Sequence, residues 1–265
     1  MMPLRLPALV TVALVVALSF FQARSVQADS DAYRELLAKY VSPGAKGINL
    51  VDYAKWKRSG ADMKRLGAYL VQLQSAKPSA MRRGEAFAFW VNLYNAATLK
   101  VVLDHYPVKS IRDIKSEGTG FLDFKAGLWR TKLLKVEGHA LSLDAIEHDL
   151  LRRKFKDPRT HYALNCASFG CPNLKPIPWT AGSLEADLDA AARAYINHPR
   201  GVSVGADGLR VSSIYHWFSE DFGGSDSALI AHFRKYADPP LLQKLKSKTS
   251  IAGHAYDWAL NDQAR

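Results

Sequence analysis

The chain has 265 residues, of which 48% are hydrophobic and 23% are charged. This composition excludes a disordered chain and a collagen-like chain, and the length allows one large domain or two small ones. The formal net charge is +11, and the only two cysteines are Cys166 and Cys171. A hydrophobic core, rather than a framework of disulfides, must therefore hold the fold together.

The N-terminal segment is typical of a secretory signal peptide. Arg5 precedes an apolar run over 8–21, and Val26 and Ala28 occupy the positions at which signal peptidases require small residues. The run is too short to span a membrane. We therefore expect cleavage after Ala28, a periplasmic or secreted protein with a single globular domain over 29–265, and no transmembrane anchor in the mature chain.

For an exported protein, the positive net charge predicts different partners than it would in the cytosol. It favours binding to an anionic envelope surface or to an acidic substrate, and no nucleic-acid partner is expected. The densest basic cluster, residues 152–156, ends an expected helix, where cations interact favourably with the helix dipole. We interpret this cluster as a solvated helix end.

Helical and strand patterns alternate along the rest of the chain, with no linker and no internal repeat. Ser142 and Ser225 are typical helix N-caps, and the apolar run over 161–165 predicts a buried strand that leads into Cys166. In chain order, the predicted elements are helices over 31–40, 61–75 and 82–105, β structure over 121–143 with a turn at 137–138, a helix over 142–155, a strand over 161–165, a helix over 185–197, a hairpin over 202–212 and a helix over 225–236.

The helix over 82–105 is apolar on nearly every side, which is typical of a helix in the middle of a fold. We therefore predict a single α+β domain with a central buried helix packed against a small, mostly antiparallel sheet. Glu85, Asn92 and Asn95 share one face of this helix. They either tie the helix to neighbouring loop backbone, as buried Asn commonly does, or orient an imidazole and stabilise an oxyanion.

Cys166 is the strongest candidate for a catalytic residue, because it lies where a predicted buried strand ends and a loop begins. A thiol becomes a nucleophile when a neighbouring imidazole lowers its pKa. His161 and His148 are candidate bases, although strand alternation places His161 opposite Cys166 unless the chain bends. The alternative is an inert thiol, or a disulfide between Cys166 and Cys171.

His161, Cys166 and Cys171 also form a set that resembles the ligands of a catalytic zinc. The two cysteines are farther apart than those of a C-x2-C pair, and an exported thiol pair tends to oxidise. Neither a metal nor another cofactor is therefore expected. Because distant partners cannot be inferred from spacing, His216 and His254 stay open as alternative bases.

Several motifs together resemble the family known as domain of unknown function 547. They are the segments 88–96 (AFWVNLYNA), 146–152 (IEHDLLR), 161–166 (HYALNC) and 256–261 (YDWALN). The resemblance covers roughly residues 30–261 and implies a bacterial exported domain. The positions that match the family pattern are Asn92, Asn95, Glu147, His148, His161 and Cys166.

Convergence of these groups would favour a cysteine-dependent hydrolase or acyl transferase acting on a peptide-like or small acyl substrate. The candidate catalytic residues are Cys166 as nucleophile, His148 or His161 as base, Asn92 or Asn95 as stabilisers of charge, and Glu85 and Glu147 as orienting groups. The alternative is a non-enzymatic envelope protein that binds a ligand or partner and has a structural Cys166–Cys171 disulfide. A thiol–disulfide oxidoreductase ranks lower, because the C-x-x-C spacing is lacking.

Overall fold

The computed structural model of the protein describes residues 31–114 and 127–264. The predicted signal peptide, residues 1–28, lies outside the described residues, as do residues 121–126 of the expected β structure. The first described element is the predicted helix over 31–40. It is followed by the antiparallel pair β1 (Val41–Pro43) and β2 (Asn49–Val51), and by the helices α2 (Tyr53–Arg58) and α3 (Gly60–Ser75).

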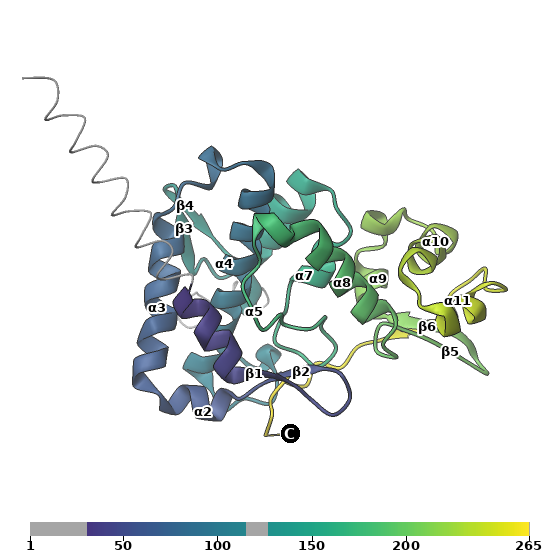
Figure 1. Cartoon of the computed structure of the whole chain (residues 1–265), viewed down its shortest axis with the longest axis horizontal. Coiled ribbons are helices and arrows are strands. Elements are labelled where there is room, and N and C mark those ends of the chain that lie inside the picture. The colour runs from purple at the N-terminus through teal and green to yellow at the C-terminus, as the bar shows by residue number, and fades with distance from the viewer. Residues whose placement is uncertain (1–30, 115–126, 265) are drawn as a thin grey trace, which may run out of the picture.

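The central helix α4 (Arg83–His105) confirms the prediction for residues 82–105. Every residue from Phe87 to Leu103 except Lys100 is buried, and α4 lies among the other elements of the left half of Figure 1. Among the described residues, α4 is the one helix long and apolar enough to cross a membrane, but 89% of its most apolar window is buried inside the protein. Such burial is the environment of a core helix.

The predicted hairpin is present, with β3 (Leu134–Val136) antiparallel to β4 (His139–Leu141) around the turn at 137–138. Before it, the short helix α5 (Gly127–Arg130) replaces the β structure expected there. Ser142 caps α6 (Leu143–Ala145), as predicted, by accepting a hydrogen bond from the backbone of Ala145. A π-helix over Ile146–Phe155 continues α6, and such wide turns are frequent at functional sites.

The strand predicted over 161–165 is wrong. Residues Thr160–Ala163 form the short helix α7, because the backbone N–H of Thr160 bonds the carbonyl of Asp157 and the Asp157 carboxylate accepts a hydrogen bond from the Arg159 backbone. A local turn therefore determines the conformation, although the apolar run is typical of a strand. Strand alternation consequently does not relate His161 to Cys166.

The C-terminal part surrounds a three-stranded sheet, in which β5 is antiparallel to β6 and β6 is parallel to β7. Ser225 caps the predicted helix over 225–236 by accepting a hydrogen bond from the Ala228 backbone. The elements are α8 (Leu184–Ile196), β5 (Val202–Gly205), β6 (Gly208–Ser212), α9 (Ser213–Trp217), α10 (Asp226–Tyr236), α11 (Pro239–Leu245) and β7 (Gly253–Ala255).

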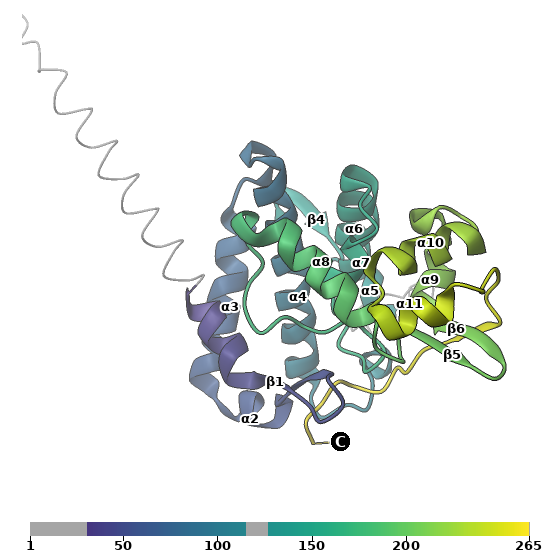
Figure 2. The same cartoon turned by 45° about the vertical axis from the view of Figure 1, so that its right-hand side comes forward.

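Two hydrophobic clusters make up the core, and α8 joins them. Leu184 and Leu188 pack into the cluster around α4, whereas Tyr195 and Ile196 pack into the cluster formed with β5, β6, α9 and α10. Figure 2 shows α8 running from one group of elements to the other. The predicted single α+β domain with a central buried helix is confirmed. Across residues 31–114 and 127–264, however, the strands form three separate small sheets rather than one.

The C-terminal segment crosses back from the second cluster to the first (Figure 1). Leu260 is buried in the cluster around α4, and the Tyr53 hydroxyl donates a 2.8 Å hydrogen bond to the side-chain carbonyl of Asn261. Asp262 forms a parallel bridge with Val51 of β2. The C-terminal end of the described chain is therefore fastened to β2 and to the start of α2.

Replacing Leu93 with alanine tests the central role of α4. Leu93 is fully buried, so we expect Leu93→Ala to lower the free energy of unfolding by about 2–5 kcal/mol in urea denaturation. Leu133, which is 40% exposed, provides the matched control. Leu133→Ala should cost less than about 1 kcal/mol, and equal losses for the two variants would contradict the assignment of α4 to the core.

Candidate functional site

The loop that carries both cysteines begins at a clamp formed by Asn95 of α4. The Asn95 side chain donates a 3.0 Å hydrogen bond to the carbonyl of Ala163 and accepts one of 2.9 Å from the backbone of Asn165. The chain then reverses at Ala167, whose φ of 59° lies in the left-handed region. This conformation is costly for a residue with a Cβ and is found mainly where tertiary contacts impose it.

The C-terminal segment holds the other side of this loop through backbone hydrogen bonds. The N–H groups of Phe169 and Gly170 donate to the carbonyls of Ala259 (2.7 Å) and Asp257 (2.8 Å), respectively. A Cβ on Gly170 would lie 2.9 Å from the backbone nitrogen of Asp257, so this close approach requires glycine. These contacts thus fix the cysteine loop against the C-terminal segment.

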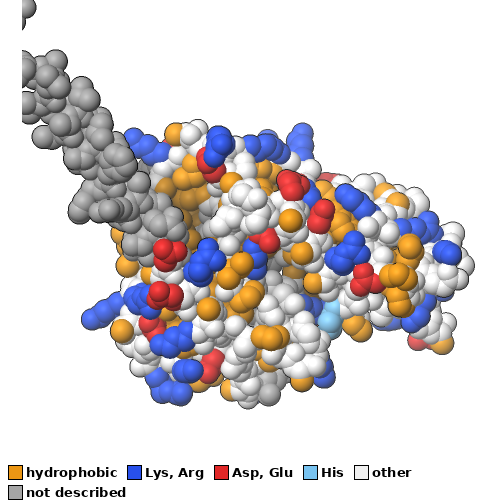
Figure 3. All heavy atoms as spheres, viewed as in Figure 1, with side chains coloured by type: hydrophobic (Ala, Val, Ile, Leu, Met, Phe, Trp, Pro, Cys, Tyr) orange, Lys and Arg blue, Asp and Glu red, His pale blue; other side chains and the backbone are white. Residues whose placement is uncertain are grey.

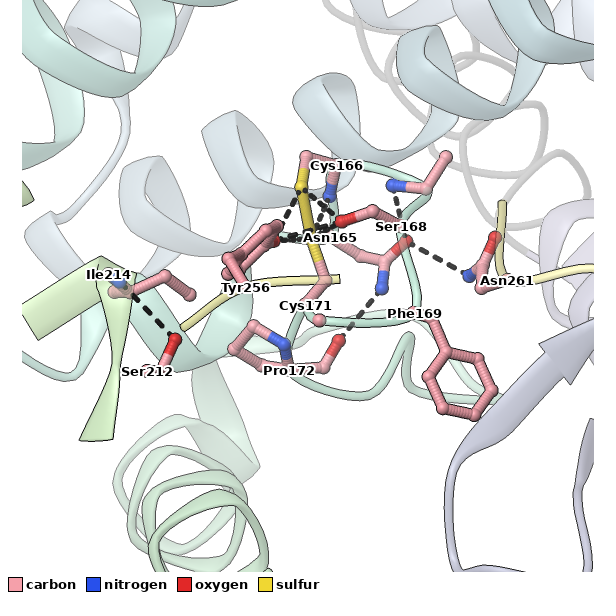
Figure 4. The surroundings of a disulfide bond; sticks show 12 residues. Asn165, Cys166, Ser168, Phe169, Cys171, Pro172, Ser212, Ile214, Tyr256 and Asn261 are labelled. Atoms are coloured by element: carbon pink, nitrogen blue, oxygen red, sulfur yellow. Dashed lines mark hydrogen bonds between the residues drawn. A yellow bond between two sulfur atoms is a disulfide. The ribbon is translucent and has the colours of Figure 1, made fainter. Parts of the chain in front are cut away.

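Cys166 and Cys171 form a disulfide, and Tyr256 covers it (Figure 4). The Tyr256 hydroxyl lies 3.1 Å from each sulfur, and the Ser168 hydroxyl donates a 2.9 Å hydrogen bond to it. Burial raises the pKa of Tyr256 well above its usual value, so the phenol stays protonated and is able to donate. The backbone N–H of Cys166 donates to the sulfur of Cys171 at 2.9 Å.

A pocket of about 100 Å³ lies against the disulfide. Six aromatic side chains from distant segments line it together with Leu164, Pro172 and Ile214, and its polar groups include a carboxylate, two imidazoles and the sulfurs. The aromatic residues are Tyr94, Trp129, Trp217, Phe218, Tyr256 and Trp258, and the polar ones are Glu147, His148, His161, Cys166 and Cys171. Glu147 accepts a 3.1 Å hydrogen bond from the Tyr94 hydroxyl.

A chain of charged and polar side chains runs behind this wall. Asp144 contacts the Nε2 atom of His148 at 3.2 Å, and a guanidinium nitrogen of Arg152 contacts Nδ1 of the same ring at 2.9 Å. Arg152 also pairs with Asp221 at 2.5 Å, and Asp221 reaches Nε2 of the buried His161 at 2.6 Å. The π-helix therefore presents His148 and Arg152 to one continuous network.

Asp221 is held in its charged form by this network. Burial raises its pKa, but hydrogen bonds from His161 and Arg152 outweigh the effect, and the pKa of Asp221 lies well below its usual value. Phe218 packs against the same groups. Its ring stacks on His161 with centroids 4.4 Å apart and lies 4.5 Å from the guanidinium carbon of Arg152.

The structure brings Glu147, His148, His161 and Cys166 into one pocket, as expected if the family motifs form a site. Within the described residues, however, the hydrogen-bond partners of the Cys166 sulfur are the hydroxyls of Ser168 and Tyr256, not an imidazole. His148 and His161 direct nitrogens to Asp144, Arg152 and Asp221 instead. Of the two states that the sequence left open for Cys166, a free thiol and a disulfide with Cys171, the structure has the disulfide.

The remaining predicted residues lie outside the pocket lining. Asn92 binds the backbone of Trp179 through both halves of its amide, at 2.8 and 2.9 Å, which is the backbone-tying role. Asn95 ties α4 to the cysteine loop in the same manner. Glu85 lies at the N-terminal end of α4, where its carboxylate accepts hydrogen bonds from Arg82, and it does not reach the pocket.

The residues considered for zinc have other partners. Both sulfurs belong to the disulfide and His161 is bonded to Asp221, and no cluster of three His, Cys, Asp or Glu side chains suited to a metal exists in the described part of the chain. The cysteine spacing and the oxidising environment expected for an exported protein are consistent with this pairing.

Sequence reasoning did not assign a role to several important residues of the site. Tyr256 belongs to the last family motif, but no spacing rule places it on the disulfide. Asp221 lies 60 residues after its partner His161, and Trp129 and Trp217 come from separate short helices. The signal available in the sequence was the last family motif, which contains Tyr256 and also Trp258 of the pocket wall.

The fold and the site define an α+β domain with an aromatic pocket beside a clamped disulfide loop. Residues 78–196 match the model of the family described as "Protein of unknown function, DUF547". The match includes α4, the π-helix and the cysteine loop, whereas Tyr256 lies after it. Neither the curated proteins nor the solved structures contain a match.

Removing the charge of Asp221 should destabilise the protein in a pH-dependent manner. We expect Asp221→Asn to lower the free energy of unfolding by about 1–3 kcal/mol near pH 7, because His161 and Arg152 lose a charged partner. The folded-state pKa is lowered, so this contribution is present above the unfolded-chain pKa of about 4 and is lost as the pH falls below it.

Urea denaturation of the wild type and Asp221→Asn between pH 7 and pH 3 measures this effect. The difference between them should shrink below about pH 4. Asp207→Asn, in the exposed turn between β5 and β6, serves as the control and should show little difference at any pH. A constant difference for Asp221→Asn over the whole range would refute the charge network as the cause.

Proposed function

We propose that this chain is an exported, non-enzymatic ligand-binding protein, whose pocket takes the positively charged head of a small organic molecule. The observation that carries the proposal is the wall of the pocket, in which aromatic rings surround a cavity that also contains the Glu147 carboxylate. Aromatic faces attract organic cations, and a carboxylate adds a charge partner. Concave, mostly apolar pockets with few polar groups are the usual sites of small ligands.

The size of the pocket restricts the ligand. A cavity of about 100 Å³ is smaller than the roughly 150 Å³ cavity that accepts benzene in an engineered protein. A methylated ammonium group fits that scale, whereas a whole peptide does not. The rest of the ligand would extend past Trp217, whose ring is 44% exposed.

The charges around the pocket are consistent with a cationic ligand. The two imidazoles already contact the carboxylates Asp144 and Asp221, and Arg152 pairs with Asp221. Glu147, in contrast, accepts from the neutral hydroxyl of Tyr94. Its charge is therefore the one that an incoming cation would meet in the pocket.

Export is supported by the signal-like segment 1–28 and by the disulfide, since disulfides persist mainly in oxidising compartments. The net charge is +11 for the whole chain and 11 − 2 = +9 once Arg5 and Arg24 are removed with the signal peptide, and it would attract the protein to anionic envelope surfaces. On the face shown in Figure 3, Lys and Arg side chains are spread over the surface with acidic residues among them. On that face the attraction would therefore come from spread charges rather than from one concentrated basic patch.

Choline titrations followed by tryptophan fluorescence test the binding proposal, because Trp129, Trp217 and Trp258 line the pocket. We expect saturable binding that Glu147→Gln weakens about tenfold, since the variant removes the charge and keeps the shape. The neutral analogue 3,3-dimethylbutan-1-ol should bind more weakly than choline to the wild type. Glu137→Gln, at the exposed turn of the β3–β4 hairpin, should bind choline as the wild type does.

Failure of choline to saturate, or equal affinity for the neutral analogue, would remove the cation-binding proposal. An unchanged affinity in Glu147→Gln would show that the carboxylate does not contact the ligand. Wild-type thermal stability of the variant, measured in parallel, would ensure that weaker binding does not arise from unfolding.

A second candidate is the cysteine-dependent acyl transferase or hydrolase, acting on a small acyl or peptide-like substrate after reduction of the disulfide. It is favoured because Cys166 lines the same pocket as His148, His161 and Glu147. In this reaction an imidazole would take the Cys166 thiol proton and the thiolate would attack the acyl carbon, which expels the alcohol or amine of the substrate with that proton. Water would then cleave the thioester, which releases the acid and restores the thiol. It requires an imidazole to move within hydrogen-bond reach of the sulfur.

This second candidate predicts multiple turnovers of p-nitrophenyl acetate by the reduced protein. The Cys171→Ser variant frees Cys166 from the disulfide, so its turnover should not depend on reductant. Cys166→Ser should be inactive both with and without reductant. A burst of one acetyl group per protein without further release, measured by absorbance and intact mass, would exclude hydrolysis of this ester.

A further inference from the structure

We infer that the Cys166–Cys171 disulfide exchanges with external thiols, with Cys166 as the sulfur that is attacked and Cys171 as the sulfur that leaves. This activity goes beyond ligand binding and does not depend on the charge of Glu147. It is supported by three features of the loop: unequal exposure of the two residues, hydrogen-bond donors around the Cys171 sulfur, and the fixed backbone on which both lie.

The two halves of the disulfide differ in access. Both cysteines line the pocket, but Cys166 is partly exposed, whereas Cys171 is only 2% exposed. A thiol that enters the pocket therefore meets Cys166. Because exchange requires the attacking sulfur to approach in line with the bond that breaks, access determines which sulfur is attacked.

The buried sulfur of Cys171 has two hydrogen-bond donors beside it. The backbone N–H of Cys166 donates to it at 2.9 Å, and the Tyr256 hydroxyl lies 3.1 Å from this sulfur, as it does from that of Cys166. Hydrogen bonds to a thiolate are stronger than those to a neutral sulfur, so these donors stabilise the departing thiolate. A more stable leaving thiolate departs faster.

The backbone on which the cysteines lie does not depend on the disulfide alone. Asn95 fixes the chain before Cys166, and backbone hydrogen bonds to the C-terminal segment fix Phe169 and Gly170. The two Cα atoms, 6.2 Å apart, are therefore kept close after the bond is broken. Reclosure is then an intramolecular reaction with a high effective concentration.

The reaction balances with a thiol as the co-reactant. A thiolate R–S⁻ attacks the Cys166 sulfur, the new R–S–S bond forms, and the Cys171 sulfur leaves with the bonding electrons as a thiolate. A second R–S⁻ attacks the R–S sulfur of this mixed disulfide, which releases R–S–S–R and the Cys166 thiolate. Two thiols are thereby oxidised, the protein is reduced by two electrons, and the two thiol protons pass to solvent or to the protein sulfurs.

Single-cysteine variants of the full chain test the order of the sulfurs. Cys171→Ser and Cys166→Ser are each incubated with oxidised glutathione, and the mixed disulfide is followed by intact mass. We expect Cys171→Ser to capture glutathione at least tenfold faster than Cys166→Ser, because Cys166 is the accessible sulfur. Equal rates, or faster capture by Cys166→Ser, would overturn the assignment.

A second measurement keeps the disulfide intact and so does not depend on the folding of these variants. The rate at which reduced glutathione reduces the native disulfide is measured for Tyr256→Phe and for Tyr40→Phe. Tyr40 is a buried tyrosine whose hydroxyl donates to Asp62, away from the sulfurs, so it provides a matched control. We expect reduction to slow about tenfold in Tyr256→Phe and to change less than twofold in Tyr40→Phe.

Two outcomes of this measurement would refute the inference. One is a wild-type disulfide that glutathione reduces only after the protein is unfolded in urea, which would make the bond purely structural. The other is equal reduction rates in Tyr256→Phe and Tyr40→Phe. Because choline binding is measured separately, loss of either proposal leaves the other intact.

Discussion

The site depends on how a buried amide satisfies its hydrogen bonds. Asn95 lies inside the hydrophobic core on α4, where an unpaired amide would cost several kcal/mol, and its partners are backbone groups on either side of Leu164. The need to pair this amide positions the chain immediately before Cys166. Asn92 acts in the same way at Trp179. Two polar residues of the central helix thus fix the loops around the pocket.

Opposing demands are met on the two sides of the pocket wall. The inner side is aromatic and suits an apolar or cationic group, whereas the outer side consists of charges that would be costly if they were unpaired. Asp221 resolves this by contacting both Arg152 and His161, and Phe218 packs against the same two side chains. Rigid side chains of this kind favour a preformed cavity over one that forms only on binding.

Much of the fold could be predicted because local patterns agree with the tertiary structure. The apolar residues all around α4 predict a central helix, and Ser142 and Ser225 identify two helix starts. The segment 161–165 could not be assigned correctly, since its apolar run suits a strand while the turn at Asp157 starts a helix. In this segment the hydrogen-bonded turn at Asp157 determines the structure, whereas hydrophobic periodicity alone predicts a strand.

The site itself was only partly predictable. The family motifs identify Glu147, His148, His161 and Cys166, which do share a pocket, but motif order contains no information about which atoms touch. The placement of Tyr256 on the sulfurs depends on a segment 90 residues beyond Cys166. Contacts of this kind are determined by the packing of the whole domain, and hence no local rule predicts them.

The return of the C-terminal segment has a consequence for the order of folding. Tyr53 and Asn261 are separated by 208 positions. The hydrogen bond between them therefore forms only after nearly the whole chain has been made. Contacts between such distant positions form late, because closing a long loop costs entropy. During synthesis the two thiols emerge well before Tyr256 does. Oxidation is therefore possible before Tyr256 reaches the sulfurs, and its hydroxyl then packs against a bond that has already been made.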